Sequence, residues 1–469
     1  MKPTPLFRVV PVTLALALLA GCTQPKAELA DPTIPPSPQH IAGRYVAVIC
    51  DADMGATAFA DGVLARPRAD ATDTLTVVGL PINPDPGPGE QTWKTPFAQV
   101  PVSNSVIGPP TALAVSPSGN AAFVVESRKP AAPGATTMND LAPGQLITPI
   151  DLSDPFQPKV LPGIDIGVKP TAVDVHPDGD LVAVVTATPG RKLVIARCDG
   201  PRIDPEGILA WDLLGSPDLA KADPVSVAWH PSGRYVAVTI ASRDEVAFYE
   251  VARNGGGGVL GIAPWGDPVK VGKHPFMGRF TPDGRHFISN NLHWGDDVEN
   301  YLAGAPPGTL SVVRLSDVPT AVPPDGGKAP VVSHSVVNTA TVGISPEGLA
   351  ISPDGRFVAT ANLRRSMLPA SDPRMQAGSV TLLGFNAESG ELTVHDEAAI
   401  NAMPEGLAFD AAGRHIIVTQ FRSFDPRAVD GELAFFRVNP AAAGRQPSLT
   451  AGEFFVGVGV GPHGVVIVR

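Results

Sequence analysis

Short runs of alternating apolar and polar positions, each broken by a tight turn, recur along most of the chain. In PEGLAISPDGRFVATAN (346–362), apolar residues alternate on both sides of a Ser-Pro-Asp-Gly turn, which is the pattern of a β-hairpin. A close relative, PEGLAFDAAGRHIIVTQ, begins at Pro404. A third alternating run follows several of these hairpins, for example GSVTLLGF (378–385). This repetition predicts one supersecondary unit that is used many times.

Six complete copies of the opening phrase occur along the chain. Each begins with proline, continues with alternating apolar residues and turns at a glycine. The starts lie 60, 54, 51, 71 and 58 residues apart, which is close to the length of a four-stranded propeller blade. The six units begin at Pro110, Pro170, Pro224, Pro275, Pro346 and Pro404.

The two ends of the chain supply the halves of a seventh unit. The C-terminal GPHGVVIVR contains only a first strand, starting at Pro462, whereas GRYVAVIC (43–50) matches only the part of a unit after the turn. Pairing the two halves closes a ring and removes exposed sheet edges. A β-sandwich or an open solenoid of hairpins would not explain why the two ends of the chain carry complementary halves of one unit. We therefore predict an all-β fold for residues 43–469: a seven-bladed β-propeller of four-stranded antiparallel blades, closed by pairing the C-terminal strand with the N-terminal strands.

The composition fits this fold and restricts the partners. Glycine (48) and proline (52) make up about a fifth of the 469 residues and punctuate the apolar runs. The net charge of −11 argues against nucleic acid as a partner, because nucleic acid needs a basic face.

Cys50 and Cys198 fall in blades that are not neighbours, so we expect two separate, buried thiols. We expect a monomer.

The first 21 residues are predicted to be a signal peptide. A positive start is followed by a short apolar stretch (9–20) that ends in Leu-Ala-Gly-Cys, which resembles a bacterial lipoprotein signal. The resemblance implies cleavage before Cys22 and acylation of that cysteine; an ordinary secretory signal is the alternative. Thr23 in place of aspartate implies the outer membrane. Residues 22–42 are then the acylated cysteine and a Pro-rich tether, and we expect a lipid-anchored protein of the cell envelope, on the periplasmic or surface face.

The repeated phrase Pro-x-x-Leu-Ala-x-Ser-Pro-Asp-Gly-Arg resembles that of the YVTN and lactonase-type seven-bladed β-propellers. This family includes bacterial phosphogluconolactonases and many secreted proteins of unknown role. The resemblance covers residues 43–469. It implies the fold, and it is only weakly specific for an activity.

The residue after each opening proline, here called position two, is predicted to lie at one mouth of the central channel. Most units place a small or apolar residue there, but three consecutive units place Glu347, Glu405 and His463. Such a cluster could act as general acid or base, or bind a cation. Alternatively, these side chains satisfy backbone donors or hydrate the channel.

The residues that follow each second strand are predicted to reach the same mouth, because that strand runs back toward it. Four units carry an arginine there, which suggests a site for a carboxylate or phosphate. The alternative is that each arginine is an exposed loop residue or pairs with a nearby acid. The candidate ligand-binding residues are Arg128, Arg243, Asn290, Asn291, His293, Asn362, Arg364, Gln420 and Arg422.

Strong catalytic and cofactor motifs are missing from the sequence. It contains no Gly-x-Ser-x-Gly elbow, no Cys-x-x-Cys pair, no phosphate-binding loop and no haem-attachment motif. The polar stretch 290–300 has enough oxygen atoms for calcium but lacks the spacing of a known calcium loop. We therefore expect a rim insertion there, no metal site and no cofactor, with calcium as the alternative.

Two classes of function remain. In the first, the protein is a lipid-anchored binding module whose channel rim takes a small anionic or sugar-like ligand or a cell-envelope protein. In the second, it is a lactonase-like hydrolase in which Glu347, Glu405 or His463 activates water, while Arg364 and Arg422 hold the carbonyl or an acidic substituent. The sequence favours binding, because no strong catalytic motif is present.

Overall fold

The computed structural model describes residues 39–64, 68, 70–87, 95–316, 332–428, 430–442 and 444–469. The predicted signal peptide, Cys22 and residues 23–38 of the tether lie outside the described residues. Within the described part of the chain, no helix has the length and apolar character needed to cross a bilayer.

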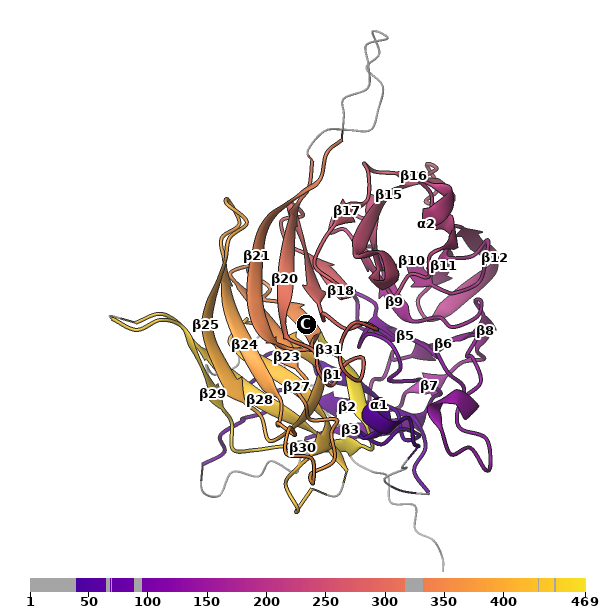
Figure 1. The fold of residues 1–469 in the computed structure, drawn as a ribbon. Coiled ribbons are helices and arrows are strands. Elements are labelled where there is room, and N and C mark those ends of the chain that lie inside the picture. Colours follow the sequence, from indigo (N-terminus) through magenta and orange to yellow (C-terminus); the bar gives the residue numbers. More distant parts are fainter. Residues whose placement is uncertain are drawn as a thin grey trace, which may run out of the picture.

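The described chain forms seven small antiparallel sheets arranged as a ring, which confirms the predicted seven-bladed β-propeller (Figure 1). Blade 1 contains β4 (Leu113–Val115), β5 (Ala121–Val125), β6 (Leu146–Asp151) and β7 (Lys159–Val160), with β8 (Ile164–Asp165) also on β6. Blade 2 contains β9 (Ala172–Val175), β10 (Leu181–Val185), β11 (Leu193–Asp199) and β12 (Arg202–Trp211). Blade 3 contains β13 (Ser226–Trp229), β14 (Tyr235–Ile240), β15 (Glu245–Arg253) and β16 (Val259–Pro264), with β17 (Val269–Lys270) also on β15.

The remaining sheets follow the same order from the channel outward. Blade 4 contains β18 (Pro275–Phe280), β19 (His286–Asn291), β20 (Pro307–Arg314) and β21 (Ser335–Ile344). Blade 5 contains β22 (Pro346–Ile351), β23 (Phe357–Asn362), β24 (Ser379–Phe385) and β25 (Leu392–Ala399). Blade 6 contains β26 (Ala402–Phe409), β27 (His415–Ser423), β28 (Gly431–Asn439) and β29 (Ser448–Ala451), with β30 (Val456–Gly459) also on β28.

The closing blade joins the two ends of the described chain. It contains β31 (Pro462–Val468), β1 (Tyr45–Cys50), β2 (Thr74–Gly79) and β3 (Phe97–Pro101), in that order from the channel. Tyr45 pairs with Val468 in the antiparallel β1–β31 ladder, and β31 also contacts the inner strands β26 and β4 of its two neighbours. In Figure 1 the yellow β31 lies beside the indigo β1. The predicted closure of the ring is therefore confirmed.

The blades are held together by apolar layers between neighbouring sheets. In β10, Val182 and Val184 pack into the core shared with blade 1, whereas Ala183 and Val185 pack into the core shared with blade 3. Successive side chains of a strand point to opposite faces, so a strand between two blades must be apolar at every position. This explains why second strands such as LVAVV read as continuous apolar runs.

The two ends of the ring differ. One end, the turn rim, carries the tight turns between first and second strands, such as residues 352–355. The other end, the loop rim, carries the longer connections that follow the second strands. These include the helix α1 (Ala58–Asp61) and the 3-10 turns Met138–Asp140 and Ala241–Arg243. The helix α2 (Pro217–Lys221) connects β12 of blade 2 to β13 of blade 3.

An apolar cap covers the loop rim. Most of its residues come from the connections that follow the second strands of the closing blade and of blades 1, 4 and 5, and they pack with Met403 of β26, Phe421 of β27 and Phe276 of β18. These buried side chains cover part of the loop rim. The buried residues of the cap include Met54, Leu141, Leu292, Trp294, Leu302, Leu363, Met367, Met403 and Phe421.

Candidate functional site

Position two is an irregularity in the ladder of several first strands. In blade 5, Pro346 pairs with Asn362 and Gly348 with Ala361, so Glu347 between them has no residue opposite. A similar shift leaves His463 without a residue opposite in the closing blade. A β-bulge of this kind redirects the side chain of the extra residue, and bulges are common beside functional sites.

The glycines that follow position two allow neighbouring first strands to approach closely. A Cβ atom at Gly348 would lie 2.4 Å from the carbonyl oxygen of Glu405, and one at Gly406 would lie 2.3 Å from the carbonyl oxygen of His463. Only glycine fits at both places. The phrases PEG, PEG and PHG in successive units therefore share a packing requirement, independent of any chemistry at position two.

Glu347 and Glu405 form a buried carboxyl pair. Each side chain is 1% exposed, and the two are hydrogen-bonded to each other. Burial raises the pKa of Glu347 to about 8. Burial first, and then the charge of Glu347, raise the pKa of Glu405 well above its usual value. A hydrogen bond between two carboxyl groups needs a proton, so the pair holds at least one at neutral pH. No residue outside the pair donates a hydrogen bond to Glu347 Oε2 or to Glu405 Oε1.

His463 lies on the next first strand, but its hydrogen bond goes elsewhere. Its Nε2 atom lies 2.7 Å from Asn104 Oδ1, and Asn104 Nδ2 donates to the carbonyl oxygens of Cys50 and Val102. Because Asn104 Oδ1 must then accept, the proton of the ring is on Nε2. Burial lowers the pKa of His463 to about 3, so the ring is neutral. The Nδ1 lone pair has no partner.

The structure thus brings Glu347 and Glu405 into contact and places a neutral imidazole one blade away. Asn104, which positions that imidazole, was missed by the sequence reasoning because it lies between β3 and β4, outside any repeat. Asp51 was missed for a different reason. It follows the second strand of the closing blade, a place that holds predicted ligand-binding residues in other units, and its charge raises the pKa of Glu405.

The predicted asparagines lie at the ends of the second strands β19 and β23, and these residues and His293 are hydrogen-bonded within their blades or to the next blade. Asn290 Nδ2 donates to the carbonyl oxygen of Glu347 at 2.8 Å, which joins blade 4 to blade 5. Asn362 Nδ2 donates to Ser379 Oγ and Thr381 Oγ1, at 3.0 and 2.9 Å. The remaining two contact Thr309 Oγ1: Asn291 Nδ2 at 3.0 Å and His293 Nε2 at 3.1 Å.

The predicted arginines occupy separate local settings on the loop rim. Arg128 Nη1 donates to the Leu141 carbonyl oxygen at 3.1 Å, and Arg243 Nε to Glu245 Oε2 at 2.7 Å. Arg364 is half-buried and adopts a positive φ of 56°. Arg422 lies 5.5 Å from the Phe424 ring and lines a rim cavity of about 440 Å³, and Gln420 lines a smaller one of about 120 Å³. Their convergence on one ligand stays a prediction.

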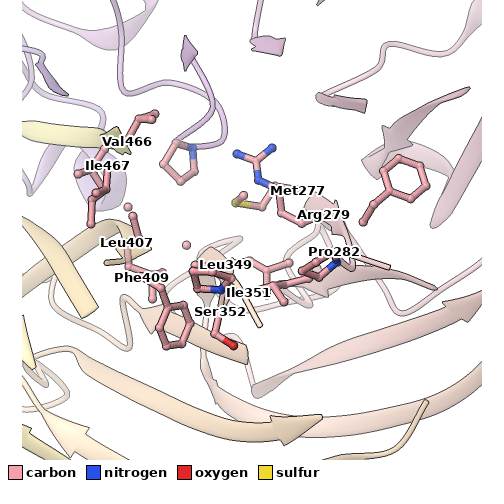
Figure 2. A pocket seen from close by; sticks show the side chains of 18 of the residues that line it. Met277, Arg279, Pro282, Leu349, Ile351, Ser352, Leu407, Phe409, Val466 and Ile467 are labelled. Carbon is pink, nitrogen blue, oxygen red and sulfur yellow. The ribbon is translucent and has the colours of Figure 1, made fainter. Parts of the chain in front are cut away.

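A cavity of about 390 Å³ occupies the turn-rim side of the channel (Figure 2). The first strands of blades 4, 5, 6 and the closing blade line it with mainly apolar side chains, including Leu349, Leu407 and Phe409. The turn prolines Pro282 and Pro353 form part of its mouth. At its inner end it reaches Gly348 and Gly406 and stops short of the glutamate side chains that precede them.

Arg279 and the C-terminal Arg469 are the charged residues that line this cavity. In Figure 2 the Arg279 side chain extends into the space between the strands. Among the described residues, no hydrogen bond or ion pair is found for its guanidinium group. Burial raises the pKa of Asp174 in β9, and the positive charge of Arg279 partly offsets this rise. Asp174 Oδ2 accepts a hydrogen bond from Trp229 N at 2.7 Å.

Arg279 could have been found from the sequence. It occupies the fifth place of its unit, and in five of the seven units that place holds alanine or valine. A charged residue at a place that is otherwise small marks a wall of the channel. The seven residues are Ala114, Asp174, Ala228, Arg279, Ala350, Ala408 and Val466.

Solved structures with the same architecture are widespread. The periplasmic gluconolactonase of Pseudomonas aeruginosa is similar over 90% of this chain and 99% of its own, with 16% identity and a TM-score of 0.54. A provisionally assigned 6-phosphogluconolactonase from Bacteroides uniformis matches 91% of this chain and all of its own, with 13% identity and a TM-score of 0.56. A functionally unknown protein from Desulfotomaculum acetoxidans has a TM-score of 0.55 at 13% identity, over 91% of this chain and 99% of its own.

These likenesses show the fold alone. No protein-family model matches the chain, and no curated protein matches it in sequence. The activity must therefore be argued from the channel itself.

Proposed function

We propose that the protein is a binding module whose central channel takes a small anionic ligand from the turn rim. The observation that carries this proposal is the 390 Å³ cavity with Arg279 extending into it. A guanidinium group without an ion pair, in a partly desolvated channel, favours a carboxylate or phosphate group. The apolar walls would contact the carbon skeleton of the ligand.

The position of the carboxyl pair supports binding over hydrolysis. Glu347 and Glu405 do not line the cavity, whose inner end reaches the glycines that follow them, and each side chain is 1% exposed. A ligand in the cavity would therefore meet Arg279 before it could meet an acid or a base. The sequence also supports a cell-envelope location through acylation of Cys22, with a membrane-bound tether and no nucleic acid among the partners.

A binding experiment tests the role of Arg279. Purified protein would be titrated calorimetrically with 6-phosphogluconate and with gluconate, the acids formed when the corresponding lactones open. We expect Arg279→Gln to weaken binding at least tenfold. Arg356→Gln is the matched control, because Arg356 is an exposed turn-rim arginine paired with Asp354. Equal affinity in both variants, or no binding of either acid by the natural protein, would overturn the proposal.

Lactonase-like hydrolysis is the second candidate, favoured by the buried carboxyl pair and by the names of two structural neighbours. In this scheme one carboxylate of the pair activates water and the protonated partner protonates the leaving alkoxide, while His463 Nδ1 is an alternative base. Opening of glucono-δ-lactone would be followed by acid release at constant pH. Turnover that is lost in both Glu405→Gln and His463→Ala supports it; turnover at the background rate rejects it.

A further inference from the structure

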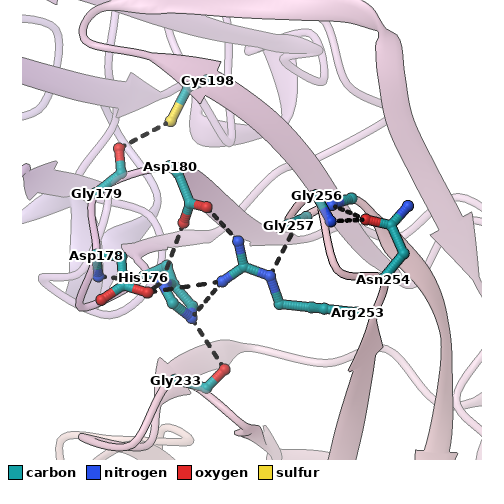
Figure 3. A network of polar contacts seen from close by, with 11 residues as sticks. His176, Asp178, Gly179, Asp180, Cys198, Gly233, Arg253, Asn254, Gly256 and Gly257 are labelled. Atoms are coloured by element: carbon teal, nitrogen blue, oxygen red, sulfur yellow. Dashed lines mark hydrogen bonds and ion pairs between the residues drawn. The ribbon is translucent and has the colours of Figure 1, made fainter.

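Buried polar side chains in the blades commonly bond to the same or the next blade, as His176 does. Its Nδ1 atom accepts from Asp178 N at 3.0 Å, and its Nε2 atom lies 2.9 Å from the Gly233 carbonyl oxygen of blade 3 (Figure 3). Asp180, beside it, is paired with Arg253. A buried polar side chain that lacks such partners therefore points to a group that the chain itself does not supply.

The amide that ends the second strand of blade 5 is satisfied by two hydroxyl groups of the third strand. Asn362 Nδ2 donates to Ser379 Oγ and Thr381 Oγ1, and Ser379 stands opposite Asn362 in the β23–β24 ladder. Asn291 of blade 4 bonds in the same way to a threonine and a serine of β20, two residues apart, at 3.0 Å each. One amide and two hydroxyls thus form a repeated polar set.

Blade 6 departs from this set. Gln420 of β27 takes the place of the amide and stands opposite Glu432 in the β27–β28 ladder. Glu432 and Ala434 therefore occupy the two places at which blade 5 has its hydroxyls. Blade 6 keeps the amide but has lost both of the hydroxyls that accept from it in blades 4 and 5.

A cavity of about 120 Å³, here called the blade-6 cavity, lies at the changed place. Gln420, Glu432 and Ala434 all line it. Gln420 is 2% exposed, and in the described part of the chain no hydrogen bond is found for its side-chain amide. An amide that is buried without a partner costs free energy, and it can both donate to and accept from a bound group. Gln420 therefore indicates a ligand in this cavity.

The charge of the blade-6 cavity favours a cation. Glu432 and Asp425 line it, and none of its described lining residues is basic. Asp425 is paired with Arg427, whereas no ion pair within the described residues is found for Glu432. Burial raises the pKa of Glu432, and the Ser423 hydroxyl, which bonds to it, partly offsets this rise. A bound cation would supply the counter-charge that Glu432 lacks.

The size and walls of the blade-6 cavity restrict the cation to a narrow carbon chain. Pockets that enclose drug-sized ligands have volumes of about 300–1,000 Å³, so this one admits only a short chain or the end of a side chain. Ile400, Phe436 and other apolar residues form the remaining walls, which suit methylene groups better than a hydrated metal ion. Phe455, 41% exposed, adds an aromatic ring, and aromatic rings attract organic cations.

We propose that the blade-6 cavity binds a primary alkylammonium group, with Glu432 as its counter-charge and Gln420 Oε1 as a further acceptor. An ammonium group has three N–H donors, which the carboxylate and amide oxygens accept. Such a group occurs both in free amines and in the lysine side chains of other proteins. The site shares no lining residue with the channel cavity of Arg279, so it does not depend on the ligand proposed there.

The test titrates the purified full-length protein calorimetrically with n-butylamine at neutral pH. The neutral compound n-butanol has the same carbon chain, and we expect it to bind at least tenfold more weakly. Glu432→Gln should weaken butylamine binding at least tenfold. Ala434→Ser should also weaken it without loss of stability, because it restores one hydroxyl of the set and fills part of the cavity. Glu391→Gln, at an exposed glutamate, is the matched control and should bind butylamine as the natural protein does.

The same titration with Nα-acetyl-lysine methylamide distinguishes the two sources of the group. Tighter binding than that of butylamine indicates a lysine side chain of a partner protein, and weaker binding indicates a free amine. Absence of butylamine binding by the natural protein, or equal affinity for butylamine and butanol, would overturn the proposal. So would unchanged butylamine affinity in Glu432→Gln. Should a variant fail to fold, the comparison of butylamine with butanol in the natural protein decides alone.

Discussion

The Nε2–H group of His463 donates to Asn104 Oδ1 across 2.7 Å, and this contact joins the last strand of the chain to the connection between β3 and β4. Both side chains are almost fully buried, at 1% and 2% exposure. The contact therefore determines which ring nitrogen presents a lone pair, and it also fastens the closing blade to blade 1.

Replacing Asn104 by alanine would leave the His463 N–H group buried without an acceptor. We expect a loss of about 1–3 kcal/mol in the free energy of unfolding, measured by urea denaturation. Asn401→Ala, at an exposed asparagine, should change stability by less than about 0.5 kcal/mol. Similar values for the two variants would show that the contact contributes nothing.

The stability of the protein should fall as the pH rises from about 5 to about 8. The pKa of Glu347 is raised in the folded protein, so the folded state holds a proton that the unfolded state has released in this range. The contribution is complete below the unfolded pKa and is lost as the pH passes the folded pKa. Each such proton gives a slope of about 1.4 kcal/mol per pH unit.

Urea denaturation at several pH values would measure this slope. Glu347→Gln should flatten the slope in part, because Asp51 and Asp73 act in the same direction. A slope that is unchanged in the variant would mean that Glu347 is ionised in the folded protein.

The glycine that follows position two should not tolerate a side chain. Gly348→Ala places a Cβ atom 2.4 Å from the Glu405 carbonyl oxygen, so two first strands must move apart. We expect a loss of about 2–4 kcal/mol, or failure to fold, on thermal or urea denaturation. Gly255→Ala is the matched control, because nothing lies within 4 Å of its Cβ position. Equal stability of the two variants would contradict the close packing.

Removing residues 462–469 should prevent ring closure. This deletion takes away β31 and leaves an edge of β1, all six of whose residues are buried in the intact ring. An unpaired apolar strand edge promotes association between chains. We expect aggregates in size-exclusion chromatography and no cooperative unfolding transition. A monomer that unfolds cooperatively would show that six blades suffice.

The architecture could be predicted from the sequence because each blade repeats one phrase at a regular interval. The half-units around Tyr45 and Val465 predicted the closing blade, because together they make one complete unit. The predicted bounds of the mature domain are not tested by the structure. The number of blades and their order along the chain can be predicted because every blade repeats the same pattern of apolar residues and turns.

The site was harder to predict because its contacts arise between blades. Position two identified Glu347 and Glu405 correctly as neighbours, as the order of the blades requires. Nothing in the repeat revealed Asn104, and the cap that covers the loop rim was not foreseen, because its apolar residues are scattered over connections of different length. Arg279 was not predicted because it stands at the fifth place of its unit, neither at position two nor after the second strand.

The first described residues of the chain join the ring at the turn rim, where the channel opens. Ala42 N donates to Asp410 Oδ2, in a turn of the turn rim, and Arg44 N donates to the carbonyl oxygen of Val468 beside the mouth of the cavity. The tether therefore leaves the molecule on the side where the channel is accessible. A lipid anchor at Cys22, as proposed above, would attach the protein to the membrane through the rim that carries the channel opening.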